Sequence, residues 1–216
     1  TKIVWEPNTS KYQRFEAKFG YTNLEYNDGY LGLSERDFAN NPYRRYSATR
    51  FDVIESEHWR SYIRHFIDIN PTFSLVSTAY GNVFERNWQK LNDCRAGGAL
   101  TRNLSLGECL QNPAGLAILK GEAPGTLRFR NNDRQYYTAG GESILNTKFQ
   151  VDETDHKLQT GVRFHHDQAK RFQLDETLTQ SAAGAITSRI AGVPGAAVSR
   201  NEETNALAFH VKDAIK

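Results

Sequence analysis

Apolar and polar residues alternate one by one over long stretches of this chain, most clearly in residues 12–22, 158–165 and 207–212. Successive side chains of a β-strand point to opposite faces, so this pattern predicts strands with one apolar and one polar face. The predicted apolar face holds Phe15, Ala17, Phe19, Tyr21, Leu158, Val162, Phe164, Leu207, Phe209 and Val211. The predicted polar face holds Arg14, Glu16, Lys18, Arg163, His210 and Lys212.

Six long strands follow from this pattern, together with the end of an earlier strand at residues 1–5. We predict them at residues 11–27, 46–69, 73–91, 136–151, 157–177 and 201–214. The faces are less clear in the second and third strands. Trp59 and Ile63 favour one face there, while Tyr62 and Phe66 favour the other. Twist or a β-bulge would explain this irregularity.

The predicted connections alternate between short and long. The short ones, 6–10, 70–72 and 152–156, are rich in turn-forming residues. The long ones lie near residues 28–45, 92–135 and 178–200. The second contains one predicted short helix, which Asn112 and Pro113 begin and Gly121 ends. The third is rich in small residues, which suggests mobility.

Strands of this length are about three times as long as those of a soluble sandwich, which have about 5–6 residues. Transmembrane barrels combine long strands with short periplasmic turns and long extracellular loops. The predicted fold class is therefore all-β: an antiparallel meander of six to seven long strands within a transmembrane β-barrel.

Composition excludes several classes of protein. The chain is 38% hydrophobic with a mean hydropathy of −0.65, and no apolar run is long enough for a transmembrane helix. A net charge of +2, with basic and acidic residues interspersed, does not predict a nucleic-acid partner. The chain begins at Thr1 and contains no methionine, so we expect a fragment of a larger protein.

Two cysteines, Cys94 and Cys109, lie in one polar, glycine-containing stretch. This arrangement suits a disulfide that closes a loop in an oxidising compartment, and two free thiols are the alternative. No histidine lies at ligand spacing for zinc, and the adjacent His165 and His166 point to opposite faces of a strand. We therefore predict no metal site. No catalytic motif is present, so we predict that the protein is not an enzyme.

Four stretches resemble a known family. They are Tyr30-Leu31-Gly32-Leu33 through Asn41-Pro42-Tyr43-Arg44-Arg45-Tyr46, then Thr78-Ala79-Tyr80 through Phe84-Glu85-Arg86-Asn87-Trp88, then Arg128-Phe129-Arg130-Asn131-Asn132-Asp133-Arg134-Gln135-Tyr136-Tyr137, and Gly161-Val162-Arg163-Phe164-His165-His166-Asp167-Gln168 with Arg171-Phe172. In this order they resemble the middle of the barrel of TonB-dependent receptors of the ferric-dicitrate transporter type.

The resemblance implies that residues 1–216 are one segment of a 22-stranded barrel in the bacterial outer membrane, with the plug domain and TonB box outside this sequence. It implies uptake of a ferric siderophore or ferric citrate, energised by the TonB–ExbB–ExbD complex through the plug. The ferric chelate is then the transported substrate, and no cofactor is expected. Outer-membrane lipid and lipopolysaccharide would be the surrounding partners.

Arginine suits a chelate with outward carboxylates, because its planar fork donates two hydrogen bonds to one carboxylate and stays charged. The candidate ligand-binding residues, all in predicted extracellular loops, are Arg44, Arg45, Arg102, Arg128, Arg130 and Arg134. Alternatively, these arginines bind lipopolysaccharide phosphates, pair with Asp37, Glu122 or Asp133, or only solvate the loops.

Two other functions remain open at this point. A passive porin or an adhesin would share the barrel without TonB coupling. A soluble β-sandwich that binds carbohydrate would use tyrosine and tryptophan as stacking platforms. In the barrel the apolar face meets lipid and the charged face meets the lumen, whereas a sandwich buries the apolar face against a second sheet.

Overall fold

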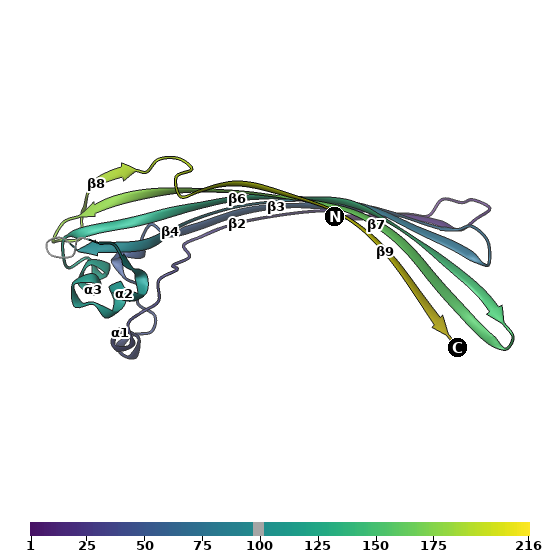
Figure 1. Cartoon of the computed structure of the whole chain (residues 1–216), viewed down its shortest axis with the longest axis horizontal. Coiled ribbons are helices and arrows are strands. Elements are labelled where there is room, and N and C mark those ends of the chain that lie inside the picture. Colours follow the sequence, from purple (N-terminus) through teal and green to yellow (C-terminus); the bar gives the residue numbers. More distant parts are fainter. Residues whose placement is uncertain (97–101) are drawn as a thin grey trace.

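The computed structural model describes residues 1–96 and 102–216. One antiparallel sheet runs almost the whole length of the molecule, and a group of short helices lies at one end of it (Figure 1). The long strands are β2 (Gln13–Tyr26), β3 (Val53–Asp68), β4 (Phe73–Ala96), β6 (Gly125–Val151), β7 (Thr154–Gln180) and β9 (Val198–Ile215). The short strands are β1 (Lys2–Trp5), β5 (Leu104–Ser105) and β8 (Ile186–Ala191).

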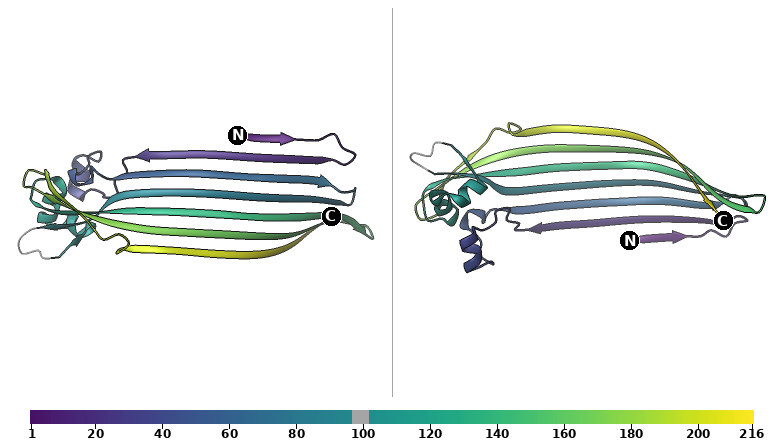
Figure 2. Two further views of the ribbon diagram at one scale, coloured as in Figure 1. Left: turned by 90° about the horizontal axis from the view of Figure 1, so that it is seen from above. Right: turned by 60° about the horizontal axis from the view of Figure 1, so that its bottom comes forward.

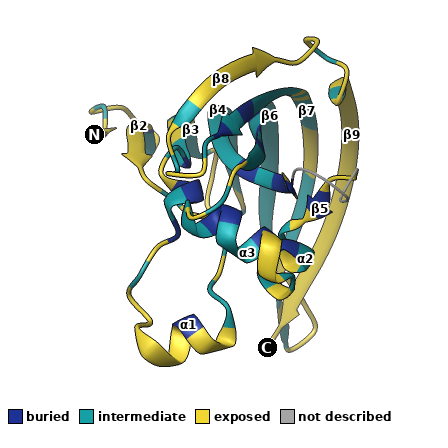
Figure 3. Cartoon of the chain, turned by 90° about the vertical axis from the view of Figure 1, so that its left-hand side faces the viewer, coloured by how far each residue is buried: buried dark blue, intermediate teal, exposed yellow. Residues whose placement is uncertain are grey.

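The helices are α1 (Glu35–Asn40), α2 (Leu106–Gln111) and α3 (Pro113–Lys120), with a 3-10 turn, η1, at Ser47–Thr49. Among the described residues no helix is long and apolar enough to cross a membrane. The strands β1, β2, β3, β4, β6 and β7 follow one another across the sheet, and β9 pairs with β7 beyond them. The long strands lie side by side in chain order (Figure 2), and the sheet curls when viewed along them (Figure 3). The predicted antiparallel meander of long strands is confirmed.

Cross-strand register shows which residues share a face, because directly opposite residues point to the same side of a sheet. Ala17 pairs with Ile63, Ile63 with Ala79, Ala79 with Gly141, and Gly141 with Phe164. Leu207 lies opposite Phe164 on the last strand. Followed across every pair, the register places all ten predicted apolar residues on one side, here called the apolar face, and all six predicted charged or polar residues on the other, the polar face.

The register also settles the two irregular strands. Trp59 and Ile63 belong to the apolar face, whereas Tyr62 and Phe66 belong to the polar face. Pairing between β3 and β4 is regular throughout, and the register shift in β4 comes only between Leu91 and Asp93. His165 and His166 point to opposite faces, as predicted.

All three long connections lie at the helical end of the sheet, and the short turns lie at the other end (Figure 1). Several predicted boundaries are wrong. The second connection ends where β6 begins at Gly125, so Arg128, Arg130 and Arg134 lie in a strand and not in a loop. The third connection contains β8, which pairs with β7. Residues 97–101 of the second connection lie outside the described part of the chain.

The buried core sits at the helical end, where residues 27–52 and 102–124 form a cap. Leu91, Leu127, Phe129 and Leu178 of the sheet pack there with Ile118 and Leu119 of α3 and with Tyr46 and Ala48. The predicted short helix is present as α3, and the shorter α2 precedes it. The Asn112 side chain accepts hydrogen bonds from the amides of Ala114 and Gly115, and Gly121 ends the helix with a φ of 80°.

Candidate ligand-binding surface

Asp37 holds one candidate arginine in place within the cap. Its carboxylate accepts hydrogen bonds from Arg44 at 3.0 Å and from the Tyr46 hydroxyl at 2.7 Å, and it lies 3.1 Å from the Lys120 ammonium. These contacts, led by the Tyr46 hydrogen bond, lower the pKa of Asp37 to about 2. Arg44 therefore serves to attach α1 to the rest of the cap.

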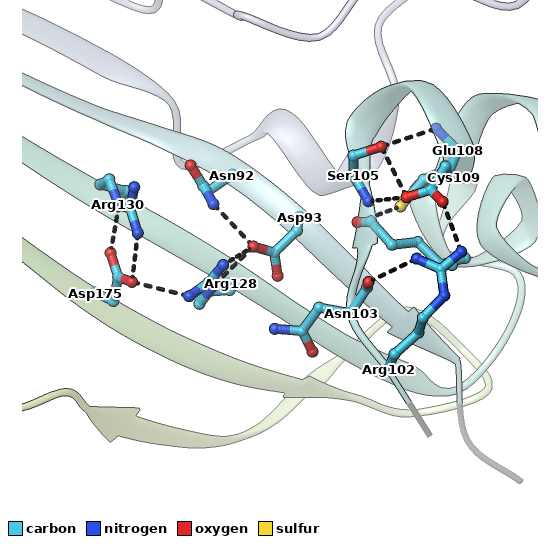
Figure 4. Close-up of polar contacts among 11 residues, drawn as sticks. Asn92, Asp93, Arg102, Asn103, Ser105, Glu108, Cys109, Arg128, Arg130 and Asp175 are labelled. Carbon is cyan, nitrogen blue, oxygen red and sulfur yellow. Dashed lines mark hydrogen bonds and ion pairs between the residues drawn. The ribbon is translucent and has the colours of Figure 1, made fainter. Parts of the chain in front are cut away.

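Two further candidates bond within the cap. Arg45 donates to the carbonyl oxygen of Thr49 at 2.9 Å. Arg102 pairs with Glu108 at 2.6 Å, and that carboxylate also caps α2 through Ser105 (Figure 4). Hydrogen bonds from Arg102 and Ser105 lower the pKa of Glu108 to about 2.

The side chains of Cys94 and Cys109 meet in the same region, in the arrangement of a disulfide. This contact joins the end of β4 to α2, so the polar groups around Glu108 are tied directly to the sheet.

Two acidic residues neutralise Arg128 and Arg130 on β6. Arg130 donates to both oxygens of Asp175, at 2.7 and 2.9 Å. Arg128 bridges Asp175, at 3.1 Å, and Asp93 (Figure 4). The Arg130 hydrogen bonds lower the pKa of Asp175, so this carboxylate stays charged at neutral pH. Four of the six candidate arginines thus have carboxylate partners within the chain.

Arg134 is different, because it belongs to a row of arginines that crosses four adjacent strands. Arg86 on β4 lies directly opposite Arg134 on β6, Arg134 opposite Arg171 on β7, and Arg171 opposite Arg200 on β9. All four share the polar face. At a strand spacing of about 4.8 Å the row is roughly 14 Å long. We call these four residues the arginine row.

Like charges placed directly opposite one another destabilise a sheet. Among the described residues no carboxylate lies within 4 Å of the guanidinium groups of Arg86, Arg134 or Arg171, and Arg200 is 4.0 Å from Glu202. The Nε atoms of Arg86 and Arg171 are buried and have no hydrogen-bond partner within residues 1–96 and 102–216. The row is therefore a strip of positive charge with donors left unused.

Aromatic side chains flank the row on both sides. Phe84 and Tyr136 stack at 6.0 Å on the side nearer the short turns. Trp88 lies on the side nearer the cap, with the Arg86 guanidinium carbon 5.9 Å from its ring centre. The Lys90 ammonium comes next, over the Tyr30 ring. Such a surface can hold an anion with planar carboxylates against arginine forks, between aromatic walls.

Sequence reasoning found one of the four row residues and missed Arg86, Arg171 and Arg200. All three stand in the predicted strands or at their ends, but nothing in the pattern fixed the register that aligns them. No group of three or more His, Cys, Asp or Glu side chains that could hold a metal ion occurs in the described residues.

Two solved structures resemble the chain over nearly its whole length. The unliganded ferric citrate transporter FecA matches with a TM-score of 0.60 and 15% identity, over 100% of this chain and 26% of that chain. The ferric-catecholate import receptor Fiu of E. coli K12, in its open form, matches with a TM-score of 0.54 and 13% identity, over 99% of this chain and 43% of that chain.

The chain therefore spans about a quarter of the first structure and about two fifths of the second. At these identities the likeness establishes the fold alone, which is that of a curled segment of a β-barrel. No protein-family model matches the chain, and no curated protein sequence matches it.

Proposed function

We propose that this chain forms part of the barrel of a TonB-dependent transporter in the bacterial outer membrane. The transporter binds a ferric chelate with outward carboxylates, either a siderophore or ferric citrate, and imports it with energy supplied through TonB–ExbB–ExbD. The plug that contacts TonB would lie outside this sequence. The apolar face would meet outer-membrane lipid, with lipopolysaccharide around its outer part, and the polar face would line the lumen.

The arginine row is the observation that carries this proposal. It places three guanidinium groups, which have no carboxylate partner in the described part of the chain, on the polar face and toward the end with the long connections. An anion in the row would offset the repulsion between the guanidinium groups that lie directly opposite one another. Charge-assisted, bidentate bonds to carboxylates are the strongest that arginine makes.

The fold argues against the soluble β-sandwich. All strands in residues 1–96 and 102–216 belong to a single sheet, and no second sheet among these residues covers its apolar face. Large side chains on that face are exposed, including Ile63, Leu207 and Phe209 at 62–74%.

Uptake of radioactive iron supplied as ferric citrate, by iron-limited cells that express the gene encoding this chain, tests the function. Cells with TonB should accumulate iron, and cells without TonB should not. Equal uptake in both would favour a passive porin, because diffusion needs no TonB. No uptake of citrate or of any siderophore chelate would refute iron transport.

Substitutions in the row test the site. Arg134→Gln and Arg171→Gln each remove a charge-assisted bond, which contributes roughly 1.5–3 kcal/mol, so the affinity for ferric citrate should fall by about tenfold to a hundredfold. Arg36→Gln is the matched control, because Arg36 lies on α1 and is exposed. Equal affinities in all three variants would remove the row from ligand binding.

A further inference from the structure

Both ends of the connection at residues 27–52 attach to one short stretch of β4. Near its start, the Asp28 carbonyl oxygen accepts a hydrogen bond from the Trp88 indole at 3.4 Å. At its end, the Asp52 carboxylate accepts a hydrogen bond from the Leu91 amide at 2.8 Å. The Tyr30 amide donates to the same carboxylate at 3.4 Å, which links the two ends.

Lys90 lies between these two attachments. Its ammonium is 3.2 Å from the centre of the Tyr30 ring and 4.4 Å from that of the Trp88 ring. The two rings meet edge to face at 5.6 Å. A cation over an aromatic ring is attracted to it, and the attraction grows as the pair loses water. Lys90 is therefore the charged contact that holds Tyr30 on the sheet.

Lys90 also belongs to the electrostatic surroundings of the arginine row. It stands four residues after Arg86 on the same strand and directly opposite Arg130. Burial lowers the pKa of Lys90, as do the charges of Arg86, Arg130 and Arg134, while Asp52 opposes them. The neighbouring arginines thus disfavour the charged form of Lys90, which is the form that binds the Tyr30 ring.

We propose that Lys90 is a positioning residue that couples anion binding in the arginine row to the seating of residues 27–52 on the sheet. This inference rests on the proposed function. An anion in the row offsets the positive charge that acts on Lys90, which strengthens its contact with Tyr30. Because coupling between two equilibria is reciprocal, the seated connection in turn raises the affinity of the row for the anion.

Hydrogen exchange in the detergent-solubilised full-length protein, with and without iron(III) citrate, tests the coupling. In the wild type, peptides from residues 27–52 should gain protection when iron(III) citrate is added. Lys90→Met keeps most of the side-chain volume but removes the charge, so this ligand-dependent gain should disappear. Lys170→Met is the control, because Lys170 is exposed on the other face of the sheet.

A merely structural role for Lys90 would lower protection equally with and without ligand, and the difference between the two states would remain. That result would overturn the coupling. The same conclusion would follow if Lys90→Met kept the full gain.

Affinities for iron(III) citrate provide a second readout. Couplings of this kind typically change affinity by about 5-fold to 150-fold, so Tyr30→Leu and Lys90→Met should each weaken binding at least about fivefold. If Tyr30 acts through Lys90, the double variant should bind no more weakly than either single variant. Additive losses would show that Tyr30 acts independently and would overturn the proposal. Failure of the wild type to bind iron(III) citrate would instead overturn the proposed function, and this inference with it.

Discussion

At the residue scale, Gly140 shows how closely side chains pack on the polar face. The Tyr80 ring crosses this glycine from β4 to reach β7, where its hydroxyl lies 2.6 Å from the Nδ1 atom of His165 and accepts from Arg163 at 3.0 Å. His165 in turn contacts Asp167 at 2.6 Å. A Cβ at position 140 would lie 2.4 Å from the Tyr80 hydroxyl and 2.6 Å from the Phe164 carbonyl oxygen.

Gly140→Ala should therefore destabilise the sheet by about 1–3 kcal/mol, because backbone as well as a side chain must shift. Thermal melting in detergent measures this loss. The neighbouring Gly141→Ala is the control, since its Cβ would meet only the Thr78 carbonyl oxygen at 3.7 Å, an ordinary contact. Equal melting temperatures for the two variants would contradict the predicted crowding.

The arginines at residues 128–134 show which features of the site the sequence pattern does not predict. Residues 128–134 carry charge on both sides of the strand, so they lack the one-by-one alternation and were predicted as loop. Alternation requires an apolar surface on one face. Near the cap one face of β6 packs against α3 through Leu127 and Phe129, and the other binds Asp175. The alignment of Arg86 with Arg134 depends on the bulge and the turns, which the pattern does not encode.

At the element scale, Asp52 makes the cap sensitive to pH. It is fully buried and accepts the two amide hydrogen bonds that attach residues 27–52 to the sheet. Burial raises its pKa from 3.8 to about 6, against the effect of these hydrogen bonds. The folded cap therefore binds this proton more tightly than the unfolded chain does. Its contribution to stability is fully present below about pH 4 and is lost as pH rises through 6.

A shift of about two pKa units corresponds to roughly 3 kcal/mol, so the cap should become less stable by about that amount between pH 4 and pH 7. Hydrogen exchange at the Leu91 amide, corrected for its intrinsic pH dependence, measures the opening free energy. Asp52→Asn cannot titrate and should flatten the slope. Asp37, whose pKa is lowered to about 2, loses its contribution only below this window, so an unchanged slope in Asp52→Asn would refute the role of Asp52.

The Cys94–Cys109 contact fixes the second connection, and a disulfide there should stabilise it by roughly 3 kcal/mol on the chain-entropy model. Intact-mass analysis of protein from native membranes, with and without reductant, should show the loss of two hydrogens in the unreduced form. The double variant Cys94→Ala with Cys109→Ala should lower the melting temperature of the cap. Free thiols in the native protein would refute an oxidising location for this connection.

The predicted boundaries of strands are accurate where apolar and polar residues alternate and inaccurate where they do not. Strands β2 and β9, which alternate over most of their length, begin and end within a few residues of the predicted positions. The strand β6 begins at Gly125, well before the predicted residue 136, because its cap-facing half has no exposed apolar face to reveal it. Helix α3 was predictable because Asn112, Pro113 and Gly121 act locally.

At the scale of the whole molecule, the apolar face should be in contact with lipid. Spin labels placed singly at Phe19, Val162 and Phe209 of the full-length protein in bilayers should be accessible to oxygen and protected from a water-soluble nickel chelate. A label at Lys18 should respond in the opposite way, because this neighbour of Phe19 lies on the polar face. Protection from both reagents at all three apolar sites would mean protein packing and would contradict the outward assignment.

The β6–β7 hairpin is longer than a strand pair needs to be in order to cross a membrane. About 17 residues of β6 separate Arg134 from the turn at its end, which is roughly 55 Å along the strand. With a tilt of about 45° this gives a height of about 40 Å, beyond a hydrocarbon core of about 30 Å. In the proposed orientation the arginine row thus stands in water outside the membrane. Dissolved ions screen exposed charges there, over about 8 Å at 0.15 M salt and about 3 Å at 1 M. The distance from which this surface attracts its cargo is therefore set by the salinity of the water around the cell.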